Sequence, residues 1–371
     1  MPGNQMGIYG TKGTPDPANV PGGRVTSVSW IDASGNLWLF GGAGFDSNGQ
    51  DSVLNDLWEV NPSTSQWTWI SGSDTIDGKA VYGTLGVAAA GNVPGARERA
   101  VSWTDNNGNL WLFGGDGFDP SGSGSIGSLN DLWEFSSSSK QWTWVSGGSA
   151  LDVKGVYGTM GVPSAGNVPG ARVNAVSWAD RSGNLWLFGG LGRDSAGMEY
   201  DLNDLWDFNP STRQWTWESG NSTVNVPGGN LCAGGVYGTE GTAAASNVPG
   251  GRNAAASWID SKGNLWLFGG LGCDVSGTAG ALNDLWEFNT ANKNWTWQSG
   301  SSSVGSPQGG TGGSSGTYGT QGTAATANTP GGRSGPRAWA DSSGSLWLFG
   351  GAGHDSTGAW GQLNDLWRYT P

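Results

Sequence analysis

The sequence predicts an all-β fold in which one four-stranded antiparallel sheet recurs five times. Two observations carry this prediction: a Trp- and Gly-rich pattern repeats along the chain, and each copy holds short aromatic segments bounded by turn residues. The chain has 371 residues, of which 69 are Gly and 24 are Trp. Disordered chains are poor in aromatic residues, so we expect many short strands packed around tryptophan rings.

Four markers define the strands of the repeat, which we name a to d in chain order. Strand a carries a recurrent tryptophan at Trp30, Trp103, Trp178, Trp258 and Trp339. Strand b is the Leu-Trp-Leu-Phe-Gly-Gly segment with its preceding residue, at 36–42, 109–115, 184–190, 264–270 and 345–351. Strand c is Leu-Asn-Asp-Leu-Trp, at 54–58, 129–133, 202–206, 282–286 and 363–367. Strand d is Trp-Thr-Trp, which occurs only four times, at 67–69, 142–144, 215–217 and 295–297.

Turn residues join these segments into antiparallel sheets. Strands a and b are separated by Asp-x-x-Gly, as at Asp32–Gly35, which is typical of a short hairpin turn. Four antiparallel strands in each of five copies indicate a β-propeller. The Gly-Gly pair after an aromatic strand, then Asn-Asp-Leu-Trp, then a Trp strand about ten residues on, resembles the kelch repeat of the galactose oxidase central-domain superfamily. The copies look like a bacterial type of long, Trp- and Gly-rich kelch repeat, and this resemblance leaves the function open.

We expect a single propeller domain over residues 1–371. Its repeats lie at approximately 25–97, 98–172, 173–252, 253–333 and 334–371, with residues 1–24 leading into blade one. The fifth copy has strands a, b and c, but its strand d appears at neither end of the sequence. The prediction is therefore a closed five-bladed ring whose fifth blade lacks its outermost strand and leaves strand c as an exposed edge. The b–c and d–a connections share one face, and both look long.

Charge and hydropathy exclude several classes of partner. The formal net charge is −13 and no basic run is present, which argues against nucleic acid and against an anionic membrane surface. No apolar stretch approaches the roughly 18 residues of a membrane span. Residues 1–5 carry neither a charged nor an apolar segment, so we expect no signal peptide in this sequence.

The two cysteines, Cys232 and Cys273, fall in loops expected on the same face of blade four. They predict a disulfide, which would anchor the insertion 225–235 and indicate an oxidising compartment. Two free thiols are the alternative. A disulfide favours a secreted or cell-surface protein.

An arginine precedes strand a in every copy, and an aspartate recurs in every strand c. The arginines are Arg24, Arg97, Arg172, Arg252 and Arg333, and the aspartates are Asp56, Asp131, Asp204, Asp284 and Asp365. One interpretation is a repeated structural Arg–Asp pair that locks neighbouring loops. The other is a convergent cationic site that binds a carboxylate or sulfate.

Aromatic residues that do not repeat are candidates for ligand binding. Phe45, Phe118, Tyr200 and Trp360 fall in b–c loops, where exposed rings could stack on sugars or anchor a protein. Packing within the loops is the alternative. The only histidine, His354, occupies the position held elsewhere by Phe45, Phe118, Arg193 and Cys273, and is a further candidate or a variable loop residue. The family resemblance suggests copper chemistry, but that site needs several histidines and a Tyr–Cys crosslink.

No catalytic, metal or cofactor motif is evident. The b–c loops carry Asp-x-x-Gly at 46–49, 119–122, 194–197, 274–277 and 355–358. This pattern is typical of turns, and Ca²⁺ would need six to eight oxygen ligands. We therefore expect a secreted or cell-surface, non-enzymatic propeller that binds a glycan or a protein through its long-loop face. A self-assembling scaffold that uses the open edge of blade five, and a sugar lyase or epimerase, remain as alternatives, with either a monomer or an edge-mediated oligomer.

Overall fold

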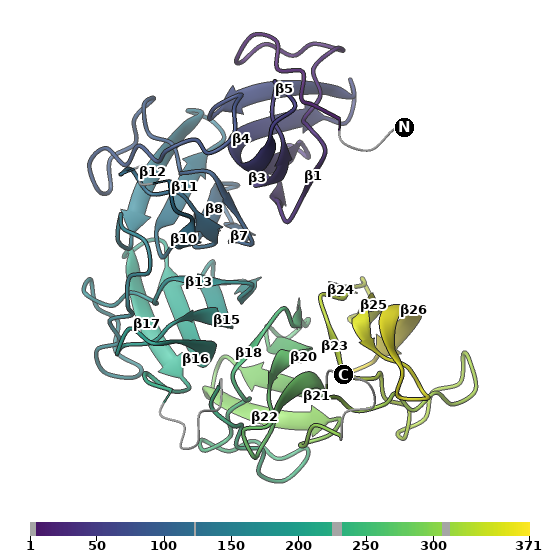
Figure 1. Ribbon diagram of the computed structural model, residues 1–371. Coiled ribbons are helices and arrows are strands. Elements are labelled where there is room, and N and C mark those ends of the chain that lie inside the picture. Colours follow the sequence, from purple (N-terminus) through teal and green to yellow (C-terminus); the bar gives the residue numbers. More distant parts are fainter. Residues whose placement is uncertain (1–4, 122–123, 225–231, 306–311) are drawn as a thin grey trace. The chain divides into compact units, whose positions relative to one another are not determined.

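The computed structural model describes residues 5–121, 124–224, 232–305 and 312–371, which form strands and turns (Figure 1). The chain divides into two compact units. The first comprises Met1–Val156, Ala165–Asn174 and Asn209–Gln214, and the second comprises Tyr157–Ser164, Ala175–Phe208 and Trp215–Pro371. Within the described ranges no helix has the length and apolar character needed to cross a membrane.

Each repeat forms antiparallel strands, and we name the strands of one repeat a blade. Blade one contains β1 (Arg24–Val25), β2 (Val28–Ile31), β3 (Leu37–Phe45), β4 (Asp51–Asn61) and β5 (Gln66–Ser71). Blade two contains β6 (Arg97–Glu98), β7 (Val101–Thr104), β8 (Leu110–Phe113), β9 (Asp116–Gly117), β10 (Gly127–Ser128), β11 (Leu132–Ser136) and β12 (Gln141–Ser146). Blade three contains β13 (Arg172–Val173), β14 (Val176–Ala179), β15 (Leu185–Arg193), β16 (Glu199–Asn209) and β17 (Gln214–Ser219). Blade four contains β18 (Arg252–Asn253), β19 (Ala256–Ile259), β20 (Leu265–Cys273), β21 (Ala279–Asn289) and β22 (Asn294–Ser299). Blade five contains β23 (Arg333–Ser334), β24 (Arg337–Ala340), β25 (Leu346–His354) and β26 (Trp360–Tyr369).

The predicted order of strands a, b, c and d is confirmed in the sheets. In blade one, β2 pairs with β3, β3 with β4, and β4 with β5, all antiparallel. The register places Trp30 opposite Trp38 and Trp58 opposite Trp69, so tryptophans of paired strands lie opposite one another. In blade two the same pattern divides into a four-stranded sheet, β12-β11-β8-β7, and a short sheet, β10-β9-β6.

The expectation of long b–c loops is wrong for four blades. In blade one, β3 and β4 continue past the Gly-Gly pair as a hairpin and leave only the turn Asp46–Gln50. Equivalent hairpins link β15 to β16, β20 to β21 and β25 to β26. The register shifts at the glycines, which is the local irregularity of a β-bulge. The residues that the sequence assigned to long loops therefore form paired strands in these four blades.

The Gly-Gly pair is explained by backbone conformation and close approach. Gly41 and Gly42 have φ values of 60° and 94°, a region that residues with a Cβ rarely adopt. A Cβ on Gly41 would lie 2.8 Å from the Arg97 carbonyl oxygen at the start of blade two and 2.9 Å from that of Leu54. The pair therefore allows strand b to bend while the following blade packs against it.

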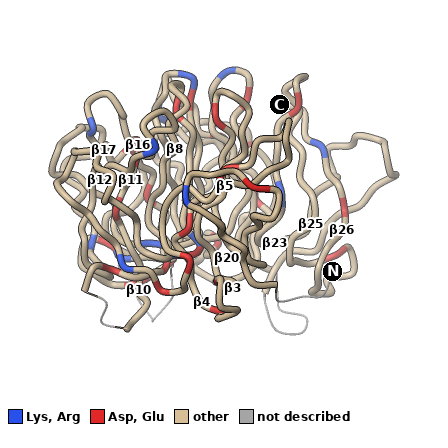
Figure 2. The backbone as a smooth tube through the Cα atoms, turned by 90° about the horizontal axis from the view of Figure 1, so that it is seen from above, with Lys and Arg blue, Asp and Glu red and all other residues tan. Residues whose placement is uncertain are grey.

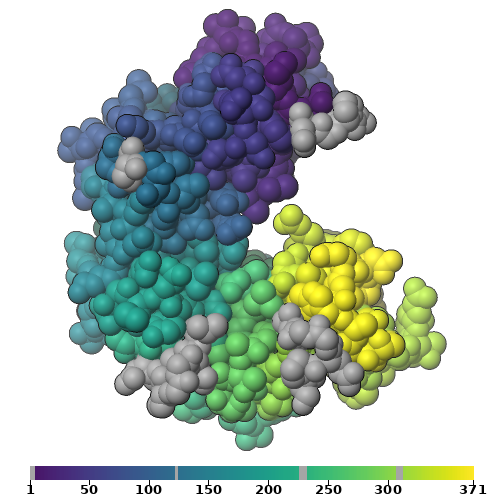
Figure 3. All heavy atoms as spheres, viewed as in Figure 1, coloured from purple at the N-terminus to yellow at the C-terminus, as the bar shows by residue number. Residues whose placement is uncertain are grey.

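Consecutive blades within a unit pack through tryptophan and aliphatic side chains. In the first unit, Trp30, Phe40 and Leu57 of blade one share a core cluster with Leu110 and Phe135 of blade two. The Trp30 indole N–H also donates to the Trp111 carbonyl at 3.1 Å. In the second unit, Trp258 donates to the Trp347 carbonyl at 2.8 Å, and blades four and five lie against each other (Figure 3).

Blade five has strand c at its edge. β26 pairs with β25, and in the part of the chain that the structure describes no strand lies on the other side of β26. Its residues alternate between exposed and half-buried over the whole length of the strand. In blade four, by contrast, β21 is covered by β22 and is largely buried.

Candidate functional site

The recurrent arginine and aspartate form buried ion pairs. In blade two, Arg97 donates from Nη1 to Asp131 Oδ1 at 2.6 Å and from Nη2 to Oδ2 at 2.7 Å. Neither side chain has exposed surface. Equivalent bidentate pairs join Arg24 to Asp56, Arg252 to Asp284 and Arg333 to Asp365. The structural interpretation of the Arg–Asp pair therefore describes these four blades.

Each pair belongs to a larger hydrogen-bond network. In blade two the Tyr82 hydroxyl and the Trp133 indole N–H both donate to Asp131 Oδ2 at 2.7 Å. Arg97 uses its remaining donors on the carbonyl oxygens of Gly95 and Gly114, each at 3.0 Å. The network therefore ties strand c to the segment that precedes strand a and to the tyrosine of the d–a segment. The tyrosine was not among the predicted site residues, although Tyr-Gly-Thr recurs in every copy and is the signal that could have identified it.

Burial and the fixed charges perturb the acid–base properties of these groups. Burial is the largest influence on the Tyr82 pKa and, with the Asp131 carboxylate, raises it far above the ordinary range. Burial opposes ionisation of Asp284, but the Arg252 guanidinium and the hydrogen bonds from Tyr237 and Trp286 hold its pKa below the usual value. Tyr82 therefore stays neutral, and Asp284 stays ionised.

The hypothesis of a cationic ligand site is not supported by this geometry. The side chains of Arg97, Arg252 and Arg333 have no exposed surface, and Arg24 has only 5%. Arg172 is equally buried and donates from Nε to the Gly170 carbonyl at 3.0 Å. An anion could not reach these guanidinium groups without displacing their carboxylate partners, because Arg and Asp already satisfy each other.

The aspartates of the hairpin tips are engaged in turns. Asp46 accepts backbone N–H bonds from Asn48 and Gln50 at 2.8 Å, and the N–H of Ile76 also donates to it. Asp274 accepts in the same way from Ser276, Thr278 and Val304. Among the described residues no group of three or more His, Cys, Asp or Glu is placed to hold a metal ion. The carboxylates hold the connection after strand d against the tip of the hairpin.

The four candidate aromatic residues lie in different environments. Phe118 is buried against Val53 and Ala96, so it cannot contact a ligand directly. Phe45 is half-buried at the end of β3, and Tyr200 packs against the cluster of Leu202, Val224 and Ala233. Trp360 is 38% exposed at the start of β26. Trp360 is therefore the one of these four with a broadly exposed ring.

His354 is buried beneath Trp360. It is 2% exposed, and its ring centroid lies 5.1 Å from that of Trp360 in an edge-on arrangement. Nδ1 lies 3.0 Å from the Gly358 carbonyl oxygen, and Nε2 has no hydrogen-bond partner among the described residues. His354 is thus placed as a packing residue of the hairpin and not as an accessible ligand-binding group.

The position of His354 and its cross-strand partner varies from blade to blade. Blade three places an ion pair there, with Arg193 Nη2 3.1 Å from Glu199. Blade four has Cys273, which forms a disulfide with Cys232. Residues 225–231 of the insertion next to Cys232 lie outside the described residues. The hairpins therefore share one backbone and differ in the chemistry at their tips.

Three exposed apolar side chains near the hairpin tips were not singled out from the sequence. Ile126, Met198 and Val275 are exposed in blades two, three and four. They stand at positions that do not repeat, which is the signal that could have identified them. Along the backbone, Lys and Arg are interspersed with Asp and Glu in both strands and loops (Figure 2).

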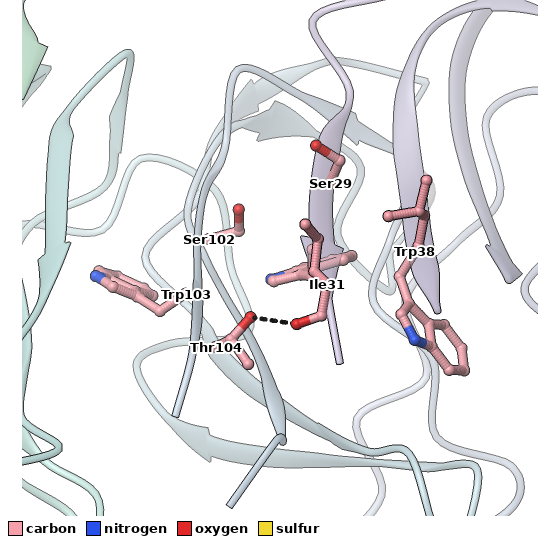
Figure 4. A pocket seen from close by; sticks show the side chains of 8 residues that line it. Ser29, Ile31, Trp38, Ser102, Trp103 and Thr104 are labelled. Atoms are coloured by element: carbon pink, nitrogen blue, oxygen red, sulfur yellow. Dashed lines mark hydrogen bonds between the residues drawn. The ribbon is translucent and has the colours of Figure 1, made fainter. Parts of the chain in front are cut away.

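An open groove of about 480 Å³ lies between strands a of blades one and two (Figure 4). Its walls include Trp30, Trp38 and Trp103, with the hydroxyls of Ser29 and Ser102 between them. The Thr104 hydroxyl donates to the Ile31 carbonyl at 3.5 Å across it. The residues that line the groove include no carboxylate, imidazole or thiol.

No protein-family profile and no curated protein matches this chain. Among solved structures it is similar to the structure of YjhT, with 16% sequence identity and a TM-score of 0.52. The similarity covers 94% of this chain and 82% of that one. At this identity the similarity concerns the fold alone. Together with the repeated antiparallel sheets, it fits a β-propeller-like fold.

Proposed function

We propose that the chain is a non-enzymatic module of a secreted or cell-surface protein that binds a glycan or a protein ligand. We further propose that it is a five-bladed propeller of kelch type and that the b–c hairpins and d–a segments provide the binding face. The observation that carries the proposal is that the hydrogen-bond networks repeat from blade to blade, whereas the residues at the hairpin tips differ. The repeated polar side chains are consumed in internal hydrogen bonds, whereas Ile126, Met198, Val275 and Trp360 remain exposed at non-repeating positions.

The disulfide supports an extracellular location, because such bonds persist in oxidising compartments. The scarcity of charge is also suited to ligands recognised by stacking and apolar contact. Aromatic rings such as Trp360 present a flat apolar face together with an indole N–H.

A glycan array tests this function. The wild-type chain should bind a restricted set of glycans, and Trp360→Ala should weaken the strongest signals by roughly tenfold or more. Trp339→Ser is the matched control, since Trp339 is also an exposed tryptophan of blade five but lies on β24. A silent array, or equal loss in both variants, would contradict glycan binding at the hairpin tips.

An assembly scaffold is the second candidate, and one observation favours it. The outer edge of β26 is unpaired among the described residues, and such edges recruit strands from other chains. Light scattering over a range of concentrations tests self-assembly, and a strict monomer at all concentrations would contradict it.

A further inference from the structure

Strand d fills a slot with the same two walls in each of the first four blades. In blade one, β5 pairs with β4 on one side. On the other side the d–a segment that precedes the blade reaches it: the Gly13 N–H donates to the Trp69 carbonyl at 2.7 Å, and the Asn19 side chain donates to the Trp67 carbonyl at 3.0 Å. A strand in this slot is therefore bonded along both of its edges.

The slot also accommodates aromatic side chains at defined positions. Trp69 packs edge-on against Tyr9, with ring centroids 5.1 Å apart, and Trp67 packs edge-on against Trp58. The tyrosine is shielded in this way in every complete blade. Its exposed fraction is 5% for Tyr9, 7% for Tyr82, 5% for Tyr157 and 4% for Tyr237.

Blade two and blade four reproduce the same contacts. In blades two and four, a glycine N–H donates to the carbonyl of the second tryptophan of strand d, at 2.7 and 2.8 Å respectively. An asparagine side chain donates to the carbonyl of the first tryptophan, at 3.0 and 3.1 Å. The residues concerned are Gly86, Asn92, Trp142 and Trp144 in blade two and Gly241, Asn247, Trp295 and Trp297 in blade four.

In blade five both walls of the slot are present without the strand. The Tyr318 hydroxyl donates to Asp365, and its ring lies 4.9 Å from Trp367, as in the other blades. Tyr318 is nevertheless 41% exposed. Asn328 keeps its bond to the Thr323 carbonyl, at 3.1 Å, but none of the described strands lies beside it to accept the second N–H. The wall is thus formed in advance of the strand that it would hold.

The geometry points to blade five as an acceptor site for an extended segment from outside residues 1–371 that carries the pattern aromatic-Thr-aromatic. The segment would pair antiparallel with β26 and would place its two aromatic rings opposite Trp367 and Tyr369, as in the other blades. This inference deepens the assembly candidate and rests on blade five acting as a binding edge.

Within residues 1–371 the sequence holds no spare segment of that kind. All four Trp-Thr-Trp segments are paired in their own blades, and residues 1–4, 225–231 and 306–311 contain no aromatic residue. Edge-to-edge pairing of two copies of β26 is disfavoured. Each copy carries its own wall at residues 317–329, and the occupied blades show room for one strand between the walls.

The test adds a synthetic peptide with the sequence of residues 140–147 to the full chain and measures binding by calorimetry. We expect one peptide per chain and slower amide hydrogen exchange in β26 and in residues 317–329. A control peptide with both tryptophans replaced by serine should bind at least roughly tenfold more weakly, because buried aromatic anchors dominate such contacts.

A chain extended at its C-terminus provides a second test of the slot. Extending the chain after Pro371 by the sequence of residues 63–72 should fill the slot, abolish peptide binding and raise the unfolding temperature. Peptide binding that persists in the extended chain, or no binding to a wild-type chain that is folded, would overturn the proposal. Concentration-dependent dimers that the extension abolishes would instead assign the slot to a second copy. None of these results depends on the glycan array, so the two proposals can fail separately.

Discussion

At the residue scale, one carboxylate per blade organises three segments that are distant in the sequence. Asp131 accepts from Arg97, Tyr82 and Trp133, so both of its carboxylate oxygens are hydrogen-bonded away from water. A buried ion pair is tolerated only when its geometry is good and its remaining donors are satisfied. The sequence predicted the Arg–Asp partnership, because both residues recur, but it did not show that burial would be complete.

Removing the arginine should therefore lower the free energy of unfolding. We expect Arg97→Ala to lower the free energy of unfolding by about 3–5 kcal/mol, since it leaves the Asp131 carboxylate buried and uncompensated. Arg99→Ala is the matched control. Its side chain is 44% exposed and makes only long surface ion pairs, so we expect a change below about 1 kcal/mol. Urea denaturation measures both, and equal effects would contradict a structural role for the pair.

A half-buried aspartate in strand c of blade three, Asp207, predicts a dependence of stability on pH. Burial is the main cause that raises the pKa of Asp207 to about 7, and Oδ1 has no hydrogen-bond partner among the described residues. In the unfolded chain this carboxyl ionises near its ordinary pKa of 3.8. Between these two values the unfolded state binds fewer protons than the folded state, so stability falls as the pH rises through that window.

Asp207→Asn removes this ionisation. The variant should be more stable than the wild type near pH 8, and the difference should shrink as the pH approaches about 4. Denaturant midpoints at several pH values provide the measurement. A constant difference at every pH would show that the carboxyl does not titrate in this window.

At the element scale, the sequence predicted strands better than it predicted connections. Strands a to d were recognised because aromatic and β-branched residues are bounded by turn signals, as at Asp32–Gly35, where Asp32 accepts the N–H groups of Ser34 and Asn36. The continuation of β3 beyond Gly41 and Gly42 was missed. Two adjacent glycines suggest the end of a strand, and only pairing with β4 shows that they form a bulge within it.

The candidate site was less predictable for a related reason. Exposure at a hairpin tip depends on what packs over the tip, and the local sequence does not encode this. Phe118 is buried by Val53 and Ala96 of the preceding blade, whereas Trp360, on a similar hairpin, is exposed. The position of the open slot in blade five follows from the missing Trp-Thr-Trp segment. That the wall at Tyr318 is already formed is seen only in the structure.

The disulfide links the end of β20 to the segment that leads into blade four. Cys232 also forms a parallel bridge with Asp201, so the bond joins the hairpins of blades three and four. We expect reduction to lower the free energy of unfolding by about 2–4 kcal/mol. Alkylation with and without reductant, followed by mass measurement, should label both cysteines only after reduction. Labelling of the unreduced chain would contradict the bond.

At the scale of the whole molecule, stability comes from repeated contacts between neighbours. Within each unit, neighbouring blades bury one another's faces, as in other repeat proteins, so the stability of a blade depends on what lies on each side of it. In the second unit, blade four is covered by blade three on one face and by blade five on the other. The face of blade five that points away from blade four exposes Trp339, Phe349 and Leu366, whose counterparts in blade four are buried.

Blade five should therefore be the least stable part of the second unit. It lacks strand d along one edge, and Leu366 is 55% exposed where Leu285 of blade four is 6% exposed. Local opening is easiest where few apolar contacts are buried and where backbone hydrogen bonds reach solvent. Hydrogen exchange followed by mass spectrometry should show β26 exchanging faster than β21, its counterpart within the same unit. The extension that fills the slot should slow exchange in β26 while leaving β21 unchanged. Equal exchange in the two strands would mean that the second unit opens as one cooperative body. It would also mean that the open edge lowers the local stability of blade five very little.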